Sequence, residues 1–309
     1  MSANLIISLD CEGKWGLSNN PKLTRNFTNS NLMKIYKMLN KFFFDLDIPV
    51  TYAFVGSFIL KKAERINFEC FENINQCYSE PLINYYYSDS SNKKDGWFVP
   101  EIYELVNNKL NEISCHSFSH LSFSKCKEKN IIDKELINCK LVEKYKKIKF
   151  KTFVFPYNQI AHLDKIEEYG FNGFRSHKIL KKNTITKAKN LFNEWNVWKK
   201  IYNQNEYNEK LNLVQIPGGF FFNWRFKWRK YLIPEFVTYL KWKNLINYAI
   251  QHNKTLNLWF HPHNILTAPS TFNVLKKVIL EANRMRDKGR LNIITQASYT
   301  KKFYAKEIY

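Results

Sequence analysis

Two histidines, His116 and His120, stand four residues apart after the strand-like segment 112–115. Two acidic residues, Asp10 and Glu12, close the first apolar run of the chain in the same way. Two imidazoles and one carboxylate make a three-ligand site that leaves one position of a divalent ion open for water or substrate, as catalytic zinc sites do. These residue types and spacings predict a hydrolytic metal site.

The two acidic residues are suited to different tasks at such a site. Because residues two apart in an extended strand point to the same side, Asp10 and Glu12 can both reach the ion. One can bind the metal while the other accepts a proton from the activated water, and the spacing leaves open which does which. A late apolar run, 256–260, is followed by His261 and His263, and either imidazole can protonate the leaving atom from the opposite wall.

Short apolar segments alternate with longer helical ones, which predicts repeated β–α units and a mainly parallel sheet. The expected strands are 4–10, 49–56, 112–116, 152–156, 173–176, 211–217, 255–261 and 291–295. The expected helices are 30–45, 101–110, 127–147, 163–169, 234–251 and 272–288. This order predicts an α/β fold, a distorted (β/α) barrel of seven or eight mainly parallel strands.

The unusual polar residues coincide with the expected strand ends. Asp10, His116 and His261 each end a strand, and Pro156 and Pro217 end two others. Barrel active sites are built at the carboxyl ends of the strands. The fold is therefore expected to gather these side chains at one face.

The length of the chain fits one enlarged barrel, and we expect a single domain over residues 1–309. Two stretches without a clear period, about 66–97 and 178–210, are expected to be insertions that form loops over the barrel mouth. Such loops often shape specificity, and a plain surface excursion is the alternative.

The composition combines a large apolar fraction with strong positive charge. Hydrophobic residues make up 45% of the chain and aromatic residues 17%, and the formal net charge is +21. Such a charge is typical of proteins that meet an anionic membrane or a charged substrate, although the abundance of Lys, Asn, Ile, Phe and Tyr also fits an AT-rich genome. No basic run stands within a nucleic-acid-binding signature, so nucleic acid is not expected as a partner.

Cysteine usage and the first residues favour a reducing, cytoplasmic compartment. The six cysteines are scattered without metal-knuckle spacing, and the chain begins with a strand-like segment rather than a cleavable leader. No stretch approaches the roughly 18 apolar residues of a membrane span. The segment 220–233 mixes aromatic rings with cations, so we expect either peripheral contact with the inner face of the membrane or a half-buried helix with a basic face.

The motifs of the sequence resemble those of the polysaccharide deacetylases, the NodB-like carbohydrate esterases. Residues 8–13 (SLDCEG) look like their first motif, and residues 116–120 (HSFSH) match their second, His-Ser/Thr-x-x-His. Residues 155–158 (FPYN) resemble the third motif, and residues 258–264 (LWFHPHN) resemble the late one. The segment 53–56 is similar to the second strand of the family.

This resemblance runs from about residue 7 to residue 263. It implies a distorted (β/α) barrel, a bound Zn²⁺ or another divalent ion such as Co²⁺ or Ni²⁺, and hydrolysis of an N-acyl group on an amino sugar. Transferred by position, it implies Asp10 as the catalytic base, His261 as the catalytic acid, and Glu12, His116 and His120 as the metal ligands.

Two departures from the family pattern leave alternatives open. The paired aspartates of the family are Asp-x-Glu here, so the roles of Asp10 and Glu12 can be reversed. The third motif usually carries an arginine that orients the base. Tyr157, followed by Asn158, takes its place, and Arg175 either substitutes for it or faces solvent.

Two further residues near the motifs also have two interpretations. Trp15 follows the acidic pair and either forms a sugar-stacking wall or packs in the core. His263 is either the catalytic acid in place of His261 or a histidine bonded to loop backbone.

The sequence thus predicts a metal-dependent carbohydrate deacetylase that removes an N-acyl group, N-acetyl in the first instance, in surface-polysaccharide or lipopolysaccharide biosynthesis. Its expected substrate is an amino-sugar glycan or a lipid- or nucleotide-linked sugar intermediate. One alternative is a deformylase of a lipid-linked formamido sugar. Another is a catalytically silent glycan- or membrane-binding module on the same fold.

Overall fold

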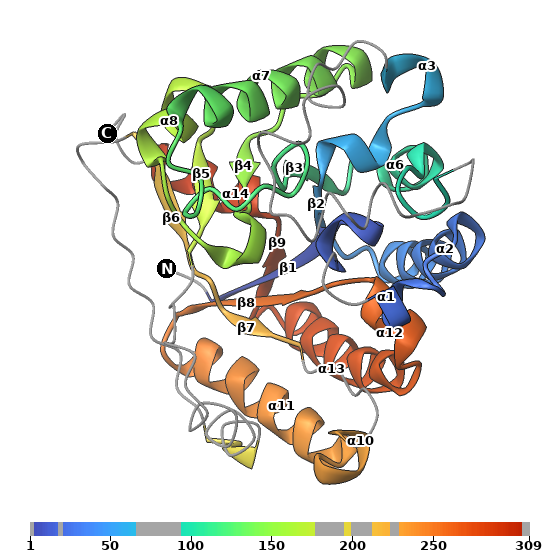
Figure 1. Cartoon of the computed structure of the whole chain (residues 1–309). Helices are drawn as coiled ribbons and strands as arrows, with labels where there is room; N and C mark the ends of the chain where they lie inside the picture. The colour runs from blue at the N-terminus through green and yellow to red at the C-terminus, as the bar shows by residue number, and fades with distance from the viewer. Residues whose placement is uncertain are drawn as a thin grey trace.

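A parallel β-sheet forms the centre of the molecule, and helices cover its outside (Figure 1). The structure is a computed structural model that describes residues 3–17, 21–65, 94–176, 195–198, 212–222 and 229–304. Eight strands follow one another in the order β6-β5-β4-β3-β2-β1-β8-β7, and β9 pairs with β1 beside this row. Every strand pairing is parallel. The predicted fold class, a distorted (β/α) barrel, is confirmed.

The strands lie where the sequence predicts them, and most are shorter than expected. They are β1 (Asn4–Cys11), β2 (Thr51–Phe54), β3 (Glu112–Cys115), β4 (Thr152–Phe153), β5 (Gly173–Arg175), β6 (Val214–Ile216), β7 (Phe220–Phe221), β8 (Thr255–Phe260) and β9 (Asn292–Ile294). The sequence did not predict β7, because two residues carry no period that distinguishes a strand.

The six predicted helices are present as α2 (Asn29–Asp45), α6 (Pro100–Val106), α7 (Lys129–Lys146), α8 (Leu163–Glu168), α11 (Glu235–Gln251) and α13 (Ser270–Asp287). The sequence missed shorter ones, which are α1 (Pro21–Thr24), α3 (Lys62–Arg65), α10 (Arg229–Leu232), α12 (His263–Thr267) and α14 (Gln296–Tyr304). Short 3₁₀ turns also occur, η1 (Gly13–Leu17), η2 (Gly56–Ile59) and η4 (Pro156–Asn158).

Strand β1 lies at the centre of the sheet, and all eight of its residues are buried. It pairs with β8 over Asn4–Leu9 on one side. On the other side β9 pairs with its first half and β2 with its second half. Strands of a parallel sheet are buried on both faces, which explains why the apolar residues of β1, Leu5, Ile6, Ile7 and Leu9, do not alternate with exposed polar ones.

The helices present one apolar face each to this sheet. In α2 the buried residues are Leu32, Ile35, Tyr36, Leu39 and Phe43, which recur at helical spacing, and the Thr28 side chain caps the helix by accepting from the Asn31 backbone N–H. One continuous apolar cluster extends from Ala3 to Ile293. The elements that carry the polar residues at the strand ends are therefore held by a common core.

Most of the two predicted insertions, 66–97 and 178–210, lies outside the described residues, as does the middle of the segment 220–233. Their expected roles stay predictions, as does the single domain. No helix in the described part of the chain is long and apolar enough to cross a membrane.

Candidate active site at the carboxyl ends of the strands

The register of the sheet brings the polar ends of three strands, β1, β3 and β8, to one edge. Asp10 of β1 is aligned with Ala53 of β2, and β3 ends beside β2, directly before His116. On the other side of β1, the last residue of β8 is aligned with Leu9, and His261 follows it. Asp10, Glu12, His116 and His261 therefore approach one another although they are up to 251 residues apart in the chain.

His116 and His120 are joined by an irregular loop rather than by a helical turn. We call residues 116–120 the histidine loop. Ser117 and His120 have left-handed backbone conformations, with φ of 59° and 64°. The two imidazole rings lie 5.0 Å apart between centroids. Left-handed conformations are unfavourable for residues other than glycine, so the surrounding structure must stabilise this loop.

The buried carboxylate of Glu135 on α7 stabilises the histidine loop from behind. It accepts hydrogen bonds from the backbone N–H groups of Phe118 and Ser119, each at 3.1 Å, and from the Ser119 hydroxyl. The carbonyls of Ser117 and Phe118 accept in turn from the backbone of η2. Glu135 was not predicted, because a glutamate within a helical segment has the same pattern whether it faces solvent or a loop.

The Glu12 carboxylate lies between several imidazoles and is buried. Its Oε2 is 2.7 Å from Nε2 of His120 and 3.4 Å from Nε2 of His116, and its Oε1 is 3.3 Å from Nε2 of His261. Burial raises the pKa of Glu12, but the charges of His261 and His120 outweigh it and leave the pKa well below its usual value. Glu12 is therefore an anion at neutral pH.

The two histidines of the loop are prepared to act as neutral ligands. Nδ1 of His116 lies 2.7 Å from the carbonyl oxygen of Val154, which can only accept, so this nitrogen carries the proton and Nε2 presents its lone pair. Burial lowers the pKa of His120 against the opposing effect of Glu12. Nδ1 of His120 is buried and has no hydrogen-bond partner among the described residues.

These three residues fit a divalent metal ion. Two ligand atoms around a tetrahedral ion with bonds of about 2.0–2.1 Å lie about 3.3–3.4 Å apart. The distance between Glu12 Oε2 and His116 Nε2 has this value. Glu12 Oε2 and His120 Nε2 lie at a hydrogen-bond distance of 2.7 Å, so these two atoms would move apart around an ion. The donor atoms of all three residues lie within 4.8 Å of one another. One carboxylate and two imidazoles also match the chemistry that Zn²⁺, Co²⁺ and Ni²⁺ prefer.

Asp10 is held differently from Glu12. Arg175, the last residue of β5, donates from Nη1 to Oδ1 at 2.6 Å and from Nη2 to Oδ2 at 2.7 Å, and both side chains are buried. Burial raises the pKa of Asp10, but the Arg175 charge and hydrogen bonds outweigh it, so the pKa is lowered overall. Of the two alternatives for Arg175, the structure shows the buried pairing with Asp10, and it places Glu12, not Asp10, in the histidine cluster.

Further contacts hold the Arg175 guanidinium in place. Nη1 donates to the Ser8 hydroxyl at 3.2 Å, Nη2 donates to Asn158 Oδ1 at 2.9 Å, and the guanidinium lies over the Trp259 ring at 4.6 Å. Asn158 thus contacts the residue that orients Asp10. Tyr157 does not take the place of the arginine at Asp10, because its ring packs edge-on against His120 at 4.6 Å and its side chain is largely exposed.

His261 and His263 stand on the wall opposite the histidine loop. Nε2 of His261 is 3.3 Å from Glu12 Oε1 and 3.9 Å from Asp10 Oδ2, and its side chain is 24% exposed. His263 is buried and stacks on His261 with ring centroids 5.1 Å apart. Burial and the neighbouring His261 charge lower the pKa of His263 to about 3. The geometry therefore favours His261 over His263 as a proton donor to a bound substrate.

Trp15 lies in the core, so the interpretation of this residue as a sugar-stacking wall is wrong. Its side chain is 2% exposed, its Nε1 donates to the carbonyl of Trp97 at 2.7 Å, and the two indole rings meet edge-on at 5.0 Å. Gly16, the next residue, lets the backbone approach the Glu12 carboxylate: a Cβ at this position would lie 1.9 Å from Glu12 Cδ.

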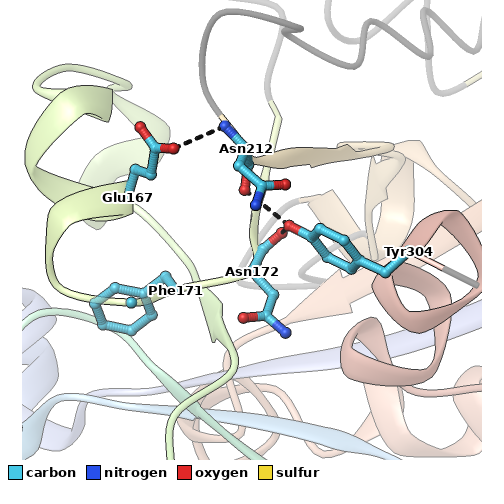
Figure 2. Close-up of a pocket in the computed structure, with 6 residues that line it drawn as sticks. Glu167, Phe171, Asn172, Asn212 and Tyr304 are labelled. Carbon is cyan, nitrogen blue, oxygen red and sulfur yellow. Dashed lines mark hydrogen bonds between the residues drawn. The ribbon is translucent and has the colours of Figure 1, made fainter. Parts of the chain in front are cut away.

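A second pocket lies at the opposite end of the sheet, where Asn172 and Asn212 precede β5 and β6 (Figure 2). The Tyr304 hydroxyl donates to both of their carbonyl oxygens, and Glu167 accepts from the Asn212 backbone N–H at 2.9 Å. This pocket is separate from the carboxyl ends of the strands, and its described lining contains no histidine or cysteine that would indicate a metal site.

Comparison with solved structures shows which proteins share this fold. A structure from Mycobacterium smegmatis, provisionally assigned as a polysaccharide deacetylase, has a TM-score of 0.63 at 11% identity over 99% of this chain and 92% of its own. A second, from Pseudomonas aeruginosa PAO1 and with the same provisional assignment, has a TM-score of 0.60 at 9% identity over 99% and 92%. The Puue allantoinase has a TM-score of 0.54 at 10% identity over 99% and 91%.

No protein-family model matches the sequence, and the search of the curated proteins found no match. The resemblance that the motifs indicate is thus confirmed at the level of the fold, which this chain shares with polysaccharide deacetylases. The allantoinase shows that the same fold also occurs in a protein with a different name and substrate. The chemistry of this chain therefore has to be argued from its own residues.

Proposed function

We propose that the protein is a metal-dependent hydrolase that removes an N-acyl group, N-acetyl in the first instance, from an amino sugar. The observation that carries this proposal is the arrangement of Glu12, His116 and His120 beside Asp10, with His261 on the opposite wall. The structures that share the fold and are provisionally assigned as polysaccharide deacetylases support the choice of a carbohydrate substrate.

Glu12, His116 and His120 would hold the ion, which is Zn²⁺ or another divalent ion such as Co²⁺ or Ni²⁺. When bound there, such an ion lowers the pKa of a water molecule and polarises the acyl carbonyl. The low pKa of Glu12 and the free lone pair of His116 Nε2 prepare these ligands before the ion arrives.

Asp10 and His261 divide the proton transfers between them. Asp10 accepts the proton of the attacking water, and the bidentate contact with Arg175 fixes the direction in which its carboxylate points. His261, which is partly exposed and near both carboxylates, gives a proton to the leaving amine nitrogen. Breaking the amide C–N bond then yields a free carboxylic acid and an amino sugar.

The pairing of Arg175 with Asp10 also bears on the alternative of a silent binding module. That alternative arose because the third motif lacks the family's arginine, and Arg175 of β5 makes the contact with the acid instead. A deformylase of a lipid-linked formamido sugar would use the same residues and is the second enzymatic candidate.

Exposed aromatic and apolar side chains on α10, at the start of α11 and in residues 195–198 support a lipid-linked substrate and peripheral contact with a membrane. Asn244 of α11 donates to the carbonyl of Val197, which places residues 195–198 against α11. We call the exposed side chains around this contact and on α10 the aromatic surface; they are Trp195, Trp198, Tyr231, Leu232 and Phe236. The formal net charge of +21 complements an anionic lipid surface.

The experiment that tests the enzymatic proposal measures the acid released from N-acetyl and N-formyl amino sugars, free and lipid-linked. Wild-type protein loaded with Zn²⁺ is compared with His116→Ala and Asp10→Asn. We expect release of one acid by the wild type and a loss of at least about 100-fold in each variant. Equal release by all three proteins, or none by the loaded wild type on any substrate, would contradict the proposal.

Membrane contact is tested separately by co-sedimentation with vesicles of anionic or zwitterionic phospholipid. The exposed fractions of Phe236 on α11 and Phe44 on α2 are nearly equal, 65% and 63%, so Phe44→Ser is a matched control for Phe236→Ser. We expect Trp198→Ser and Phe236→Ser to weaken binding to anionic vesicles and Phe44→Ser to leave it unchanged. Equal effects of the two phenylalanine substitutions would contradict a specific aromatic surface.

A further inference from the structure

The two oxygens of the Glu12 carboxylate face two different pairs of histidines. Oε2 faces His116 and His120 of the histidine loop. Oε1 faces His261 at 3.3 Å, and a donor set of Glu12, His261 and His263 again lies within 4.8 Å. Among the described residues, only these two groups combine three possible ligands, and they share one carboxylate.

The second group has the geometry and the chemistry of a metal site. The 3.3 Å between Glu12 Oε1 and His261 Nε2 equals the separation of about 3.3 Å that two ligands of a tetrahedral ion have. Neither ring nitrogen of His263 is hydrogen-bonded to a described residue, although the side chain is buried between Phe27 and His261. Among the described residues, no hydrogen bond therefore competes with an ion for these nitrogens.

Asp10 does not compete for this role. Both of its oxygens accept from Arg175, at 2.6 Å and 2.7 Å. Glu12 has the longer side chain of the two acids and points each oxygen at a separate histidine pair. Its carboxylate can therefore bridge two ions, as carboxylates do in two-metal sites.

We propose that Glu12, His261 and His263 form a second divalent-cation site, which shares the Glu12 carboxylate with the His116–His120 site. Imidazole and carboxylate donors select a borderline transition metal, so Zn²⁺, Co²⁺ and Ni²⁺ are the expected occupants. This site requires no movement of the histidine loop.

Occupation of the second site has a consequence for catalysis, and this part rests on the proposed function. An ion held there would coordinate a His261 ring nitrogen in the place of a proton. His261 then has no proton to give to the leaving amine. An excess of metal therefore inhibits the enzyme, while the ion held by the histidine loop stays in place.

The stoichiometry of binding tests the site without any assay of activity. The full chain is dialysed to equilibrium against stepwise concentrations of free Zn²⁺, and bound ion is counted by elemental mass spectrometry. We expect two ions per chain in the wild type, and one each in His263→Phe and His116→Ala. The control variant, His252→Gln, changes an exposed histidine at the end of α11, before β8 begins, and should keep two.

The outcomes separate the second site from the proposed function. A single ion in the wild type that is lost in His116→Ala and kept in His263→Phe overturns the second site and leaves the proposed function intact. Two ions that persist in His263→Phe also overturn the second site. If neither His116→Ala nor His263→Phe loses an ion, the result contradicts both the second site and the metal site of the proposed function.

Two further measurements guard against a variant that fails to fold. Phenylalanine keeps an aromatic ring against Phe27, and His263→Gln provides a second substitution without that ring. Titration of the wild type with Co²⁺ should give two successive increments of visible absorption, and a single increment overturns the proposal. Between one and five equivalents of Zn²⁺, the rate of acid release by the wild type should fall at least about tenfold, because general-acid catalysis contributes about 10²–10⁴-fold. The rate of acid release by His263→Phe should change less than about twofold over the same range.

Discussion

The buried pair of Arg175 and Asp10 should make one of the largest single contributions to both the stability and the shape of the site. Substitution of Arg175 by Gln removes two hydrogen bonds of 2.6 Å and 2.7 Å and leaves a buried carboxylate without a counter-charge. Breaking a buried ion pair by removing one partner costs about 3–5 kcal/mol. For a denaturant slope of about 3 kcal/mol/M, the urea midpoint should fall by roughly 1–2 M.

The assay is urea unfolding of the full chain in the presence of a chelator, which keeps metal binding from contributing to the measured free energy of unfolding. Arg284→Gln is the matched control, because Arg284 pairs with Glu281 at 2.8 Å but has 51% of its side chain exposed. Exposed pairs contribute about 0–1 kcal/mol, so this control should lie near the wild type.

The pH dependence of Arg175→Gln provides a second signature. In the wild type the pKa of Asp10 is lowered below its usual value of 3.8, so its stabilising contribution is present above pH 3.8 and is lost as the pH falls through the lower, folded-state value. Without Arg175, burial raises the pKa of Asp10 in the folded state against the smaller opposing effects of His116 and His261. The destabilisation caused by the substitution should therefore be largest at pH 7 and shrink as Asp10 becomes protonated.

A double-mutant cycle with Asp10→Asn decides whether the pair itself is responsible. Removing both charges should destabilise the fold by at least about 2 kcal/mol less than the sum of the two single substitutions. The reasoning is refuted if Arg175→Gln lies within about 1 kcal/mol of the wild type, or if the two substitutions add within about 0.5 kcal/mol.

Three further predictions concern Gly16 and Glu135 at the site and Glu112 at the amino end of β3, where its carboxylate accepts from Thr51 and Thr152. Gly16→Ala would place its Cβ 1.9 Å from Glu12 Cδ, so the Zn²⁺ affinity, measured by competition with a chelating dye, should fall by more than about 100-fold. Gly289 has open space around it, so Gly289→Ala should keep the wild-type Zn²⁺ affinity. An unchanged affinity in Gly16→Ala would contradict the close approach. Glu135→Gln weakens the support of the histidine loop and should lower Zn²⁺ affinity by about 10–100-fold, and an unaffected affinity would show that the loop holds its shape without this carboxylate. Burial raises the pKa of Glu112 above its usual value of 4.5, so the wild type should lose stability as the pH rises from 4.5 through the folded-state pKa. Urea unfolding between about pH 4 and 8 should show no such loss in Glu112→Gln. The same pH dependence of stability in both proteins would contradict this prediction.

The amino-acid sequence determined the fold class and the location of the site. Strand-like and helical segments alternate along the chain, and a parallel sheet follows from that order because each strand returns to the same end through a helix. The polar residues Asp10, His116 and His261 end their strands, and the carboxyl ends of parallel strands share one edge. Local patterns therefore sufficed to predict which residues gather.

The sequence did not determine what each gathered residue contacts. Asp10 and Glu12 are chemically alike and two residues apart, and only the tertiary structure places Arg175 against the one and the histidines against the other. The distance along the chain between Asp10 and Arg175 is 165 residues, and no local period reports on a contact of that range. The same reason hid Glu135, whose contact with the histidine loop depends on how α7 packs behind it.

Burial was likewise decided by the tertiary structure alone. A tryptophan after an acidic pair can equally well line a sugar site or fill a core, and the packing of Trp97 and Phe98 against Trp15 settles this in favour of the core. His261 and His263 differ by two positions, yet one is 24% exposed and the other is buried. The turn at Pro262 into α12 separates them, because the side-chain directions at the start of a helix no longer alternate as in a strand.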